Sequence, residues 1–288
     1  MISRLGILFM RLIAPLPLPW VRAFGHAVGL LLYLVVVPRR KVVDVNLRLC
    51  FPQWSEAERR AVARQVFVNV AQAWFDRAWL WHADTETVRS RLMVTGAVNE
   101  MDGKEPVILF CPHFVGLDAG VTAVTQQIPR SVIGIYTRQS DPVIDAWVLR
   151  GRFRFGDARP VSRAEGVRDI VSVVRKGGVL YLLPDMNFGP EESIFVPFYG
   201  VQAATVPSLS RFARLCRAKV VPLITRMTPS GYEVRLLPAW TGFPSEDPEA
   251  DTALMNRRLE SYVDEMPSQY YWVHKRFKTR PEGEPGVY

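Results

Sequence analysis

A histidine and an aspartate near the middle of the chain could act together as a general base. His113 and Asp118 stand five residues apart in the segment Cys111-Pro-His-Phe-Val-Gly-Leu-Asp118, at the end of an apolar run. A neutral imidazole accepts a proton from a hydroxyl, and a carboxylate bonded to its second nitrogen fixes the tautomer. The pair can meet only if His113 lies on a strand-to-helix turn and Asp118 in the first helical turn, as Pro112 and Gly116 favour. The simpler alternative is that Asp118 only caps a helix.

Cys111 offers a different chemistry. In an extended strand Cys111 and His113 project to the same side, and a Cys–His pair can form a covalent acyl intermediate. Transfer or hydrolysis through an acyl-Cys111 therefore stays open beside direct transfer through His113. The simpler interpretation of Cys111 is a buried strand cysteine.

Several common catalytic motifs are absent from the sequence. It contains no GxSxG nucleophile elbow, no P-loop, no GxGxxG fingerprint and no HExxH zinc motif. Its four histidines are scattered, and its three cysteines form neither a metal-type CxxC pair nor a disulfide framework. We therefore expect no metal and no cofactor, and the cysteine usage fits a reducing compartment.

The composition describes a folded, basic protein. Of 288 residues, 49% are hydrophobic and 22% charged, which supports a packed core, and the net charge is +8. A basic surface suits nucleic acid, an anionic membrane or an acidic protein, although solvated cations are the simpler interpretation. The cations gather in two clusters: Arg138, Arg150, Arg152, Arg154, Arg159 and Arg163, then His274, Lys275, Arg276, Lys278 and Arg280. Arginine forks suit phosphate groups, and since no nucleic-acid signature is present we expect no nucleic-acid partner.

Short β-rich runs alternate with helical patterns from about Leu92 onward. Strands are predicted at 107–111, 131–136, 179–183, 220–225 and 232–237, and helices at 117–127, 142–150, 164–176 and 207–217. This order predicts an α/β domain with a mostly parallel central sheet flanked by helices, and the apolar strands fit burial on both faces. Pro222 predicts an edge or a bulge in the fourth strand, and the fifth alternates as an edge strand would.

Polar residues follow three of these predicted strands. His113 comes after the first, Arg138 after the second, and Asp185 and Asn187 after the third. Ligands of such sheets bind beyond the carboxyl ends of the strands. The sequence therefore predicts the functional site at this edge.

The N-terminal segment is unusually apolar. The apolar stretch at 5–37 is interrupted by Arg11 and three prolines. Its second run, 23–37, is shorter than the length that usually spans a bilayer, and three cations follow it directly. No small-residue cleavage site follows, which argues against a signal peptide. A buried hairpin of two core helices and a membrane anchor or interfacial hairpin both remain open, and Trp20 and Tyr33 favour the membrane.

A helix is predicted to start after Ser55, because Ser55 and Glu58 form a capping box. Apolar residues at four-residue spacing continue it to about Trp81. We expect three regions: an anchor or helical hairpin at 1–41, a helical segment at 42–91 and the α/β domain at 92–288.

Several segments together resemble one enzyme family. The spacing of His113 and Asp118 is similar to the HX4D or HX4E motif of glycerolipid acyltransferases. Four further segments resemble conserved blocks of the late lipid A acyltransferases, the last two their C-terminal signature. They are Pro184-Asp-Met-Asn-Phe-Gly189, Ile194-Phe-Val-Pro-Phe-Tyr-Gly200 continued by Ala203-Ala-Thr-Val-Pro207, Pro267-Ser-Gln-Tyr-Tyr-Trp272, and Lys275-Arg-Phe-Lys-Thr-Arg-Pro281. With 142–156, which also resembles the family, the likeness covers nearly the whole chain.

The resemblance implies an acyltransferase that moves a fatty acyl chain from acyl carrier protein to a hydroxyl of a lipid A precursor, in lipopolysaccharide biosynthesis. His113 would be the general base and Asp118 its orienting partner, while Arg138, Arg150 and Asp185 would line the site or contact phosphate. The enzyme would lie at the bacterial inner membrane with its catalytic domain facing the cytoplasm. Acyl carrier protein is acidic, which suits a basic enzyme.

Two positions depart from the family pattern. The usual aspartate-glutamine-aspartate block reads Asp185-Met186-Asn187, and the arginine expected after the second strand is shifted by one, to Arg138. Three alternatives stay open: a glycerophospholipid acyltransferase, a thioesterase using Cys111, and a non-catalytic membrane protein that binds anionic lipid.

Overall fold

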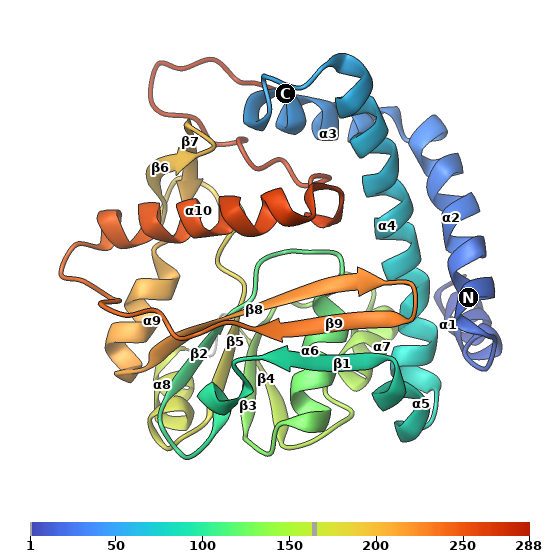
Figure 1. Ribbon diagram of the computed structural model, residues 1–288, viewed down its shortest axis with the longest axis horizontal. Helices are drawn as coiled ribbons and strands as arrows, with labels where there is room; N and C mark the ends of the chain where they lie inside the picture. The colour runs from blue at the N-terminus through green and yellow to red at the C-terminus, as the bar shows by residue number, and fades with distance from the viewer. Residues whose placement is uncertain (1, 163–165) are drawn as a thin grey trace.

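The computed structural model describes residues 2–162 and 166–288, and within them a seven-stranded sheet forms the centre of the protein (Figure 1). The strand order is β1-β9-β8-β2-β5-β3-β4. The strands are β1 Leu92–Gly96, β2 Val107–Phe110, β3 Val132–Tyr136, β4 Ala158–Ser162, β5 Val179–Leu182, β8 Lys219–Thr228 and β9 Gly231–Leu236. Five neighbouring pairs are parallel and only β8 and β9 pair antiparallel, so the predicted mostly parallel sheet is confirmed.

Helices cover both faces of the sheet because alternate strand residues point to opposite sides. Val107 and Leu109 of β2 pack in one core with α6 Leu117–Gln127 and α7 Pro142–Arg152, while Ile108 and Phe110 pack in a second core. The second core includes α8 Val167–Arg175, α9 Ser208–Cys216 and α10 Pro248–Glu265. A hairpin of β6 Ile194–Phe198 and β7 Val201–Thr205 packs against α10. The short elements are α5 Thr85–Ser90 and the 3₁₀ turns η1 Val98–Met101 and η2 Pro267–Gln269.

The predicted helices agree with these elements, although the start of the 164–176 helix and Arg163 lie outside the described residues. Two expectations about the strands are wrong. β8, which carries Pro222, is a central strand between β2 and β9, and β9 lies between β8 and β1 rather than at the edge.

Pro222 is tolerated inside the sheet because of where the β9 ladder stops. Phe110 of β2 pairs with Pro222, whereas pairing with β9 begins only at Leu223. The Pro222 carbonyl accepts from the N–H of Leu237, just after β9, at 2.9 Å. The ring nitrogen faces the same side as this carbonyl, so the missing donor costs no bond of either ladder.

Four N-terminal helices pack beside the sheet: α1 Ile2–Ile13, α2 Leu18–Val35, α3 Val37–Cys50 and α4 Glu56–His82. The capping box at Ser55 and Glu58 is present and α4 ends one residue beyond Trp81, as predicted. Figure 1 shows α2 running beside α4. A side chain at Gly29 would place its Cβ 2.5 Å from the Val68 Cα, so only glycine permits this close packing.

One face of the N-terminal hairpin has no protein partner among the described residues. Only Leu18, Val21, Gly25 and Gly29 of α2 are buried. The large apolar side chains exposed on α1 and α2 include Ile2, Leu5, Leu8, Leu12, Trp20, Leu31 and Leu34. In the described chain α2 is the one helix long and apolar enough to cross a bilayer. The hairpin is therefore not a buried core element.

Candidate active site

Two strand ends bring His113 and Asp185 together. β2 and β5 are parallel neighbours, with Phe110 opposite Leu182, so the residues that follow them meet at the carboxyl edge of the sheet. His113 Nδ1 lies 2.7 Å from Asp185 Oδ1, and the backbone N–H of His113 donates to Asp185 Oδ2 at 3.0 Å. The hydroxyl of Tyr270 also donates to Oδ2, at 3.0 Å.

These contacts favour the ionised form of Asp185 and fix the tautomer of His113. Burial by itself would raise the pKa of Asp185, but the charge and hydrogen bonds of His113 and the hydrogen bond of Tyr270 hold it below its ordinary value. A carboxylate can only accept, so Nδ1 of His113 carries a proton, and in the neutral imidazole Nε2 is the nitrogen with the lone pair. His113 lines a cavity, and it can therefore take a proton from a bound hydroxyl.

The C-terminal signature holds the histidine loop in place. The N–H of Tyr271 donates to the carbonyl of His113, and the N–H of Val115 donates to the carbonyl of Gln269, both at 2.9 Å. Phe114 and Tyr270 form an antiparallel bridge between the same two segments. A segment more than 150 residues downstream of His113 thus fixes the position of the proposed base.

Asp118 lies in the first turn of α6, as predicted, but it does not bond to His113. Its Oδ2 accepts from Arg77 Nε of α4 and its Oδ1 from Arg152 Nε of α7, each at 2.6 Å. Burial would raise the pKa of Asp118, but the two guanidinium groups lower it far below its ordinary value. The expectation that Asp118 orients His113 is therefore wrong for this geometry, because Asp185 occupies Nδ1.

Two glycines allow these helices to approach closely. A Cβ on Gly120 of α6 would lie 2.7 Å from the Tyr181 hydroxyl and 2.6 Å from Thr225 Oγ1. On α7, a Cβ at Gly151 would lie 2.2 Å from the Trp81 ring. Because Gly151 precedes Arg152, it lets the end of α7 reach Asp118 and α4.

A cavity of about 640 Å³ contains both clusters. His113, Asp118, Arg77 and Arg152 contribute polar groups to its wall. Its apolar lining includes Ile135, Phe153, Ile170, Leu182, Val206 and Phe212. Its rim carries five exposed large apolar residues: Trp74, Val167, Phe188, Leu215 and Tyr271. An apolar enclosure with few polar groups is typical of a site for an amphipathic ligand.

The other predicted site residues lie elsewhere. Arg138 is 88% exposed, with its nearest carboxylate, Asp145, 3.9 Å away. Arg150 is exposed and its Nε bonds to the carbonyl of Ala146 in its own helix. Neither is part of the cavity lining, and their substrate-binding role stays a prediction. Asp185 is fully buried behind His113 rather than exposed to a substrate.

Cys111 is poorly placed for a nucleophile. Its side chain is buried, its Sγ lies 3.5 Å from the Leu109 carbonyl, and it is not among the lining residues of the cavity. Burial raises the pKa of the thiol well above its usual value, which opposes the thiolate that a nucleophile needs. The geometry does not support a route through acyl-Cys111.

Sequence reasoning missed Arg77, Arg152 and Tyr270 as site residues. Arg152 belongs to the arginine cluster and Tyr270 to the C-terminal signature, so the sequence singled out both residues without indicating a role for either. Arg77 carried no signal, since it is a single cation within an aromatic stretch of helix. Among the described residues no group of histidine, cysteine and carboxylate side chains could hold a metal ion.

Comparison with known proteins gives one consistent result. The sequence model of the family described as bacterial lipid A biosynthesis acyltransferase matches residues 1–279. The lipid A biosynthesis lauroyltransferase of Escherichia coli (strain K12) is 33% identical, over 99% of this chain and 94% of its own length. The lipid A biosynthesis myristoyltransferase of the same organism is 33% identical, over 85% and 77%. Its palmitoleoyltransferase is 30% identical, over 99% and 92%.

Proposed function

The chain belongs to the bacterial lipid A biosynthesis acyltransferases and is an acyltransferase of lipid A biosynthesis, and from this premise we propose how it works. The donor is acyl carrier protein, the acceptor is a hydroxyl of a lipid A precursor, and His113 is the general base. One observation carries the proposal: His113 Nδ1 is bonded to buried Asp185 while the imidazole lines the cavity.

In the proposed reaction Nε2 of His113 removes the proton of the acceptor hydroxyl as its oxygen attacks the thioester carbonyl. A carbon–oxygen bond forms, the carbon–sulfur bond breaks, and the imidazolium returns the proton to the leaving thiolate. Asp185 stabilises the imidazolium between these steps, as the carboxylate of a catalytic triad does. Asp118 acts at a distance from the proton, by holding Arg77 and Arg152 at the cavity wall.

The acyl chain occupies the apolar part of the cavity in this proposal. Ile170 and Phe212, from α8 and α9, lie on that side of the lining, together with Leu182 of β5. Burial of methylene groups there stabilises the bound chain by about 0.8 kcal/mol each. No bound cofactor is needed, because the thioester is already activated.

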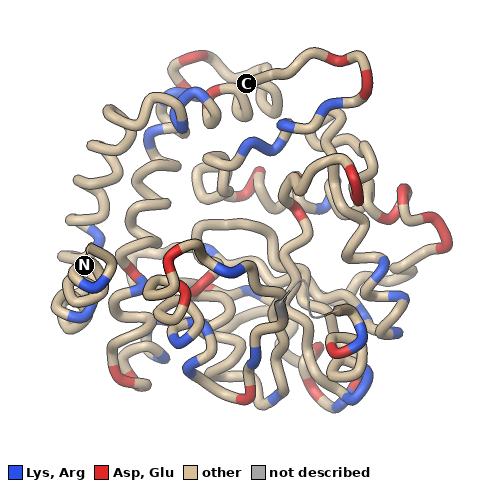
Figure 2. The backbone as a smooth tube through the Cα atoms, turned by 180° about the vertical axis from the view of Figure 1, so that it is seen from behind, with Lys and Arg blue, Asp and Glu red and all other residues tan. Residues whose placement is uncertain are grey.

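We also propose that the enzyme lies on the inner membrane with its catalytic domain facing the cytoplasm. The exposed apolar face of α1 and α2 supports immersion in lipid. In the sequence no charge lies between Arg22 and the basic residues 39–41, and Figure 2 shows most of α2 without charged residues. The basic residues 39–41 suit anionic headgroups. Because α2 packs against α4, we propose that α2 lies in the membrane–water interface and does not cross the bilayer. Complete release of the protein by detergent-free washing at high salt would contradict it.

The decisive experiment measures transfer from labelled acyl carrier protein to a tetraacylated lipid A precursor by the full-length enzyme. His113→Ala should lose roughly 10²–10⁴-fold in kcat while remaining folded. His26→Ala is the matched control, because His26 is an exposed histidine on α2, and it should equal the wild type. Asp185→Asn should also lose kcat, since an amide can hold His113 in the wrong tautomer.

Two outcomes would contradict the proposal. If His113→Ala transfers acyl chains as fast as wild type, His113 is not the base. If folded wild type is inactive with every acyl chain length offered, the donor or the acceptor is wrong.

A further inference from the structure

Two arginines in the cavity share a single carboxylate. Arg77 and Arg152 each bond to Asp118 through Nε, at 2.6 Å, which leaves the terminal guanidinium nitrogens of both residues for other partners. Nη1 of Arg77 is buried and bonds to nothing among the described residues. A buried donor without an acceptor costs free energy, so the Asp118 carboxylate alone does not satisfy the donors of these two cavity-lining arginines.

We propose that Arg77 and Arg152, held by Asp118, bind a phosphate group of one of the two substrates. The proposal rests on the acyltransferase function above and names a binding site within it. Two guanidinium groups against one carboxylate leave an excess positive charge at the wall. The planar fork of arginine matches phosphate oxygens with paired hydrogen bonds.

The pair is preorganised for such a ligand. The Arg77 guanidinium carbon lies 4.2 Å from the centre of the Trp74 ring and 5.3 Å from that of Trp81, so two aromatic faces fix its plane. Its side chain is only 18% exposed, and that of Arg152 is 32% exposed. Low exposure strengthens the attraction to an anion, because water screens it less.

Burial also separates this pair from the two predicted substrate-binding arginines, Arg138 and Arg150. Arg138 and Arg150 are exposed and do not line the cavity, so an anion bound near them would remain hydrated. Arg77 and Arg152 line the same cavity as His113. A phosphate bound by them would position its substrate relative to the base.

Both substrates of the proposed reaction can supply the phosphate. The lipid acceptor carries phosphate on its sugars, and the acyl group of the donor is carried on a phosphopantetheine arm. The two sources share one chemistry, a phosphate ester oxygen. An acceptor without its phosphate, or a donor without its phosphate, distinguishes the two sources.

The test crosses an arginine variant with a dephosphorylated substrate, using the full-length enzyme. Arg77→Gln and Arg152→Gln are compared with wild type on phosphorylated and dephosphorylated acceptor. They are then compared with acyl-phosphopantetheine and acyl-pantetheine as donors. Arg64→Gln is the matched control, since Arg64 is an exposed arginine on the same helix α4. Arg77→Lys retains the positive charge and loses the planar guanidinium group with its paired donors.

For one of the two substrates, each Gln variant should raise KM roughly tenfold to a hundredfold. Removing the phosphate from that substrate should raise the wild-type KM by a similar factor and abolish the difference between variant and wild type. Arg77→Lys should fall between wild type and Arg77→Gln, and Arg64→Gln should match wild type.

Two results would overturn the proposal while leaving the proposed function intact. One is a wild type that is indifferent to phosphate on both substrates. The other is a variant penalty that is equal with and without phosphate. Failure of the proposed function looks different, because wild type would then transfer no acyl group, or His113→Ala would retain full activity.

Discussion

Two ion-pair clusters lie on α4 and begin at adjacent residues. Asp76 binds Arg22 of α2, and Arg77 binds Asp118 of α6. In the cluster around Asp76 every nitrogen of Arg22 has a partner, whereas in the cluster around Asp118 Nη1 of Arg77 has none among the described residues. We call these the closed cluster and the open cluster.

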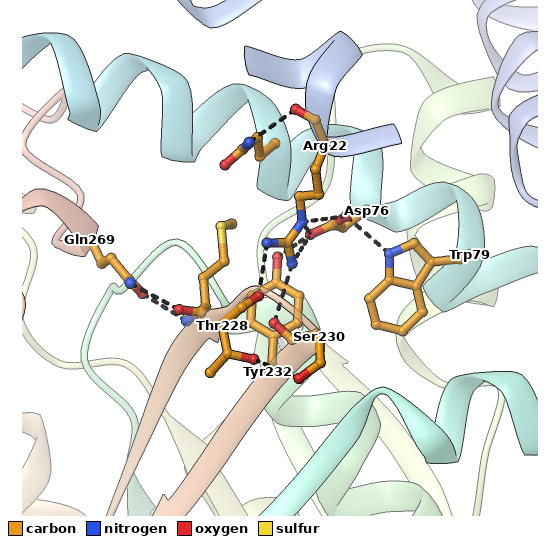
Figure 3. A network of polar contacts seen from close by, with 10 residues as sticks. Arg22, Asp76, Trp79, Thr228, Ser230, Tyr232 and Gln269 are labelled. Atoms are coloured by element: carbon orange, nitrogen blue, oxygen red, sulfur yellow. Dashed lines mark hydrogen bonds and ion pairs between the residues drawn. The ribbon is translucent and has the colours of Figure 1, made fainter. Parts of the chain in front are cut away.

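The closed cluster joins three parts of the protein (Figure 3). Arg22 Nε donates to both oxygens of Asp76, at 3.0 and 2.8 Å, and its terminal nitrogens donate to the carbonyls of Thr228 and Gly231. Tyr232 and Trp79 also donate to Asp76, at 2.6 and 3.0 Å. It therefore attaches the apolar helix α2 to α4 and to the β8–β9 turn.

The difference between the clusters separates structure from binding. A buried charge cluster whose hydrogen bonds are complete has nothing left to offer a ligand, and its contribution is to the position of α2. The open cluster has the same residue types but keeps donors at a cavity wall. The comparison predicts that changes in the closed cluster act on stability and changes in the open cluster act on activity.

The largest effect is expected for Asp76→Asn. Removing the buried carboxylate leaves Arg22 without its counter-charge, which should lower the free energy of unfolding by about 3–5 kcal/mol. Urea or thermal unfolding in detergent measures it. Asp44→Asn, an exposed aspartate on α3, should change stability by less than about 0.5 kcal/mol. A similarly small loss for Asp76→Asn would mean that the closed cluster does not anchor α2.

Asp118→Asn should act on activity. Loss of the charge that holds both arginines should lower kcat/KM by roughly 10²-fold, or about 2–3 kcal/mol. The pKa of Asp118 is depressed, so its ionised form is present above its unfolded pKa and is lost only as pH falls through the lower folded pKa. The factor between variant and wild type should therefore be constant from about pH 5 to 8.

A pH–rate profile of both proteins tests this. A factor that shrinks toward the acid end of that range would show that Asp118 is neutralised there, against the prediction. Asp44→Asn again serves as the control and should follow the wild-type profile throughout.

Gly151→Ala should displace Arg152 from its position in the open cluster. The added methyl group would overlap the Trp81 ring, and overpacking of this kind costs about 1–3 kcal/mol of stability. We expect a fall in kcat/KM to accompany it, because α7 must shift. Gly6→Ala on α1 has open space for its methyl group and should be neutral or slightly stabilising. Wild-type stability and kinetics in Gly151→Ala would refute the close-packing argument.

The smallest effect is expected from inorganic phosphate in the absence of substrate. At ten times its dissociation constant, phosphate should stabilise the wild type by about 1.4 kcal/mol, seen as a rise in Tm. Arg77→Gln should lose the rise in Tm that comes from bound phosphate, while Arg64→Gln should keep it. Phosphate also stabilises proteins in general, so only the difference between the two variants counts. Equal shifts in both variants would speak against phosphate binding at the open cluster.

Much of the fold could be predicted because it depends on residues close in sequence. The capping box of Ser55 and Glu58 starts α4, and continuous apolar runs form the strands that are buried on both faces. The position of Pro222 was misjudged, because the sequence does not show that the pairing of β8 with β9 begins only at Leu223, one residue after Pro222. The strand ends that carry His113 and Asp185 were predicted to form the site, but their mutual bond was not.

By itself the sequence determined the helices and strands, the edge of the sheet that holds the site, and the family, because local pattern and motif spacing encode them. Tertiary structure alone decided which carboxylate bonds to His113. Asp118 is five residues from His113, yet the first turn of α6 directs it to Arg77 and Arg152. Asp185 is far away in sequence, but β2 and β5 are neighbours in the sheet and bring it within 2.7 Å of the imidazole. Strand order is set by packing of the whole chain, which residue spacing does not contain.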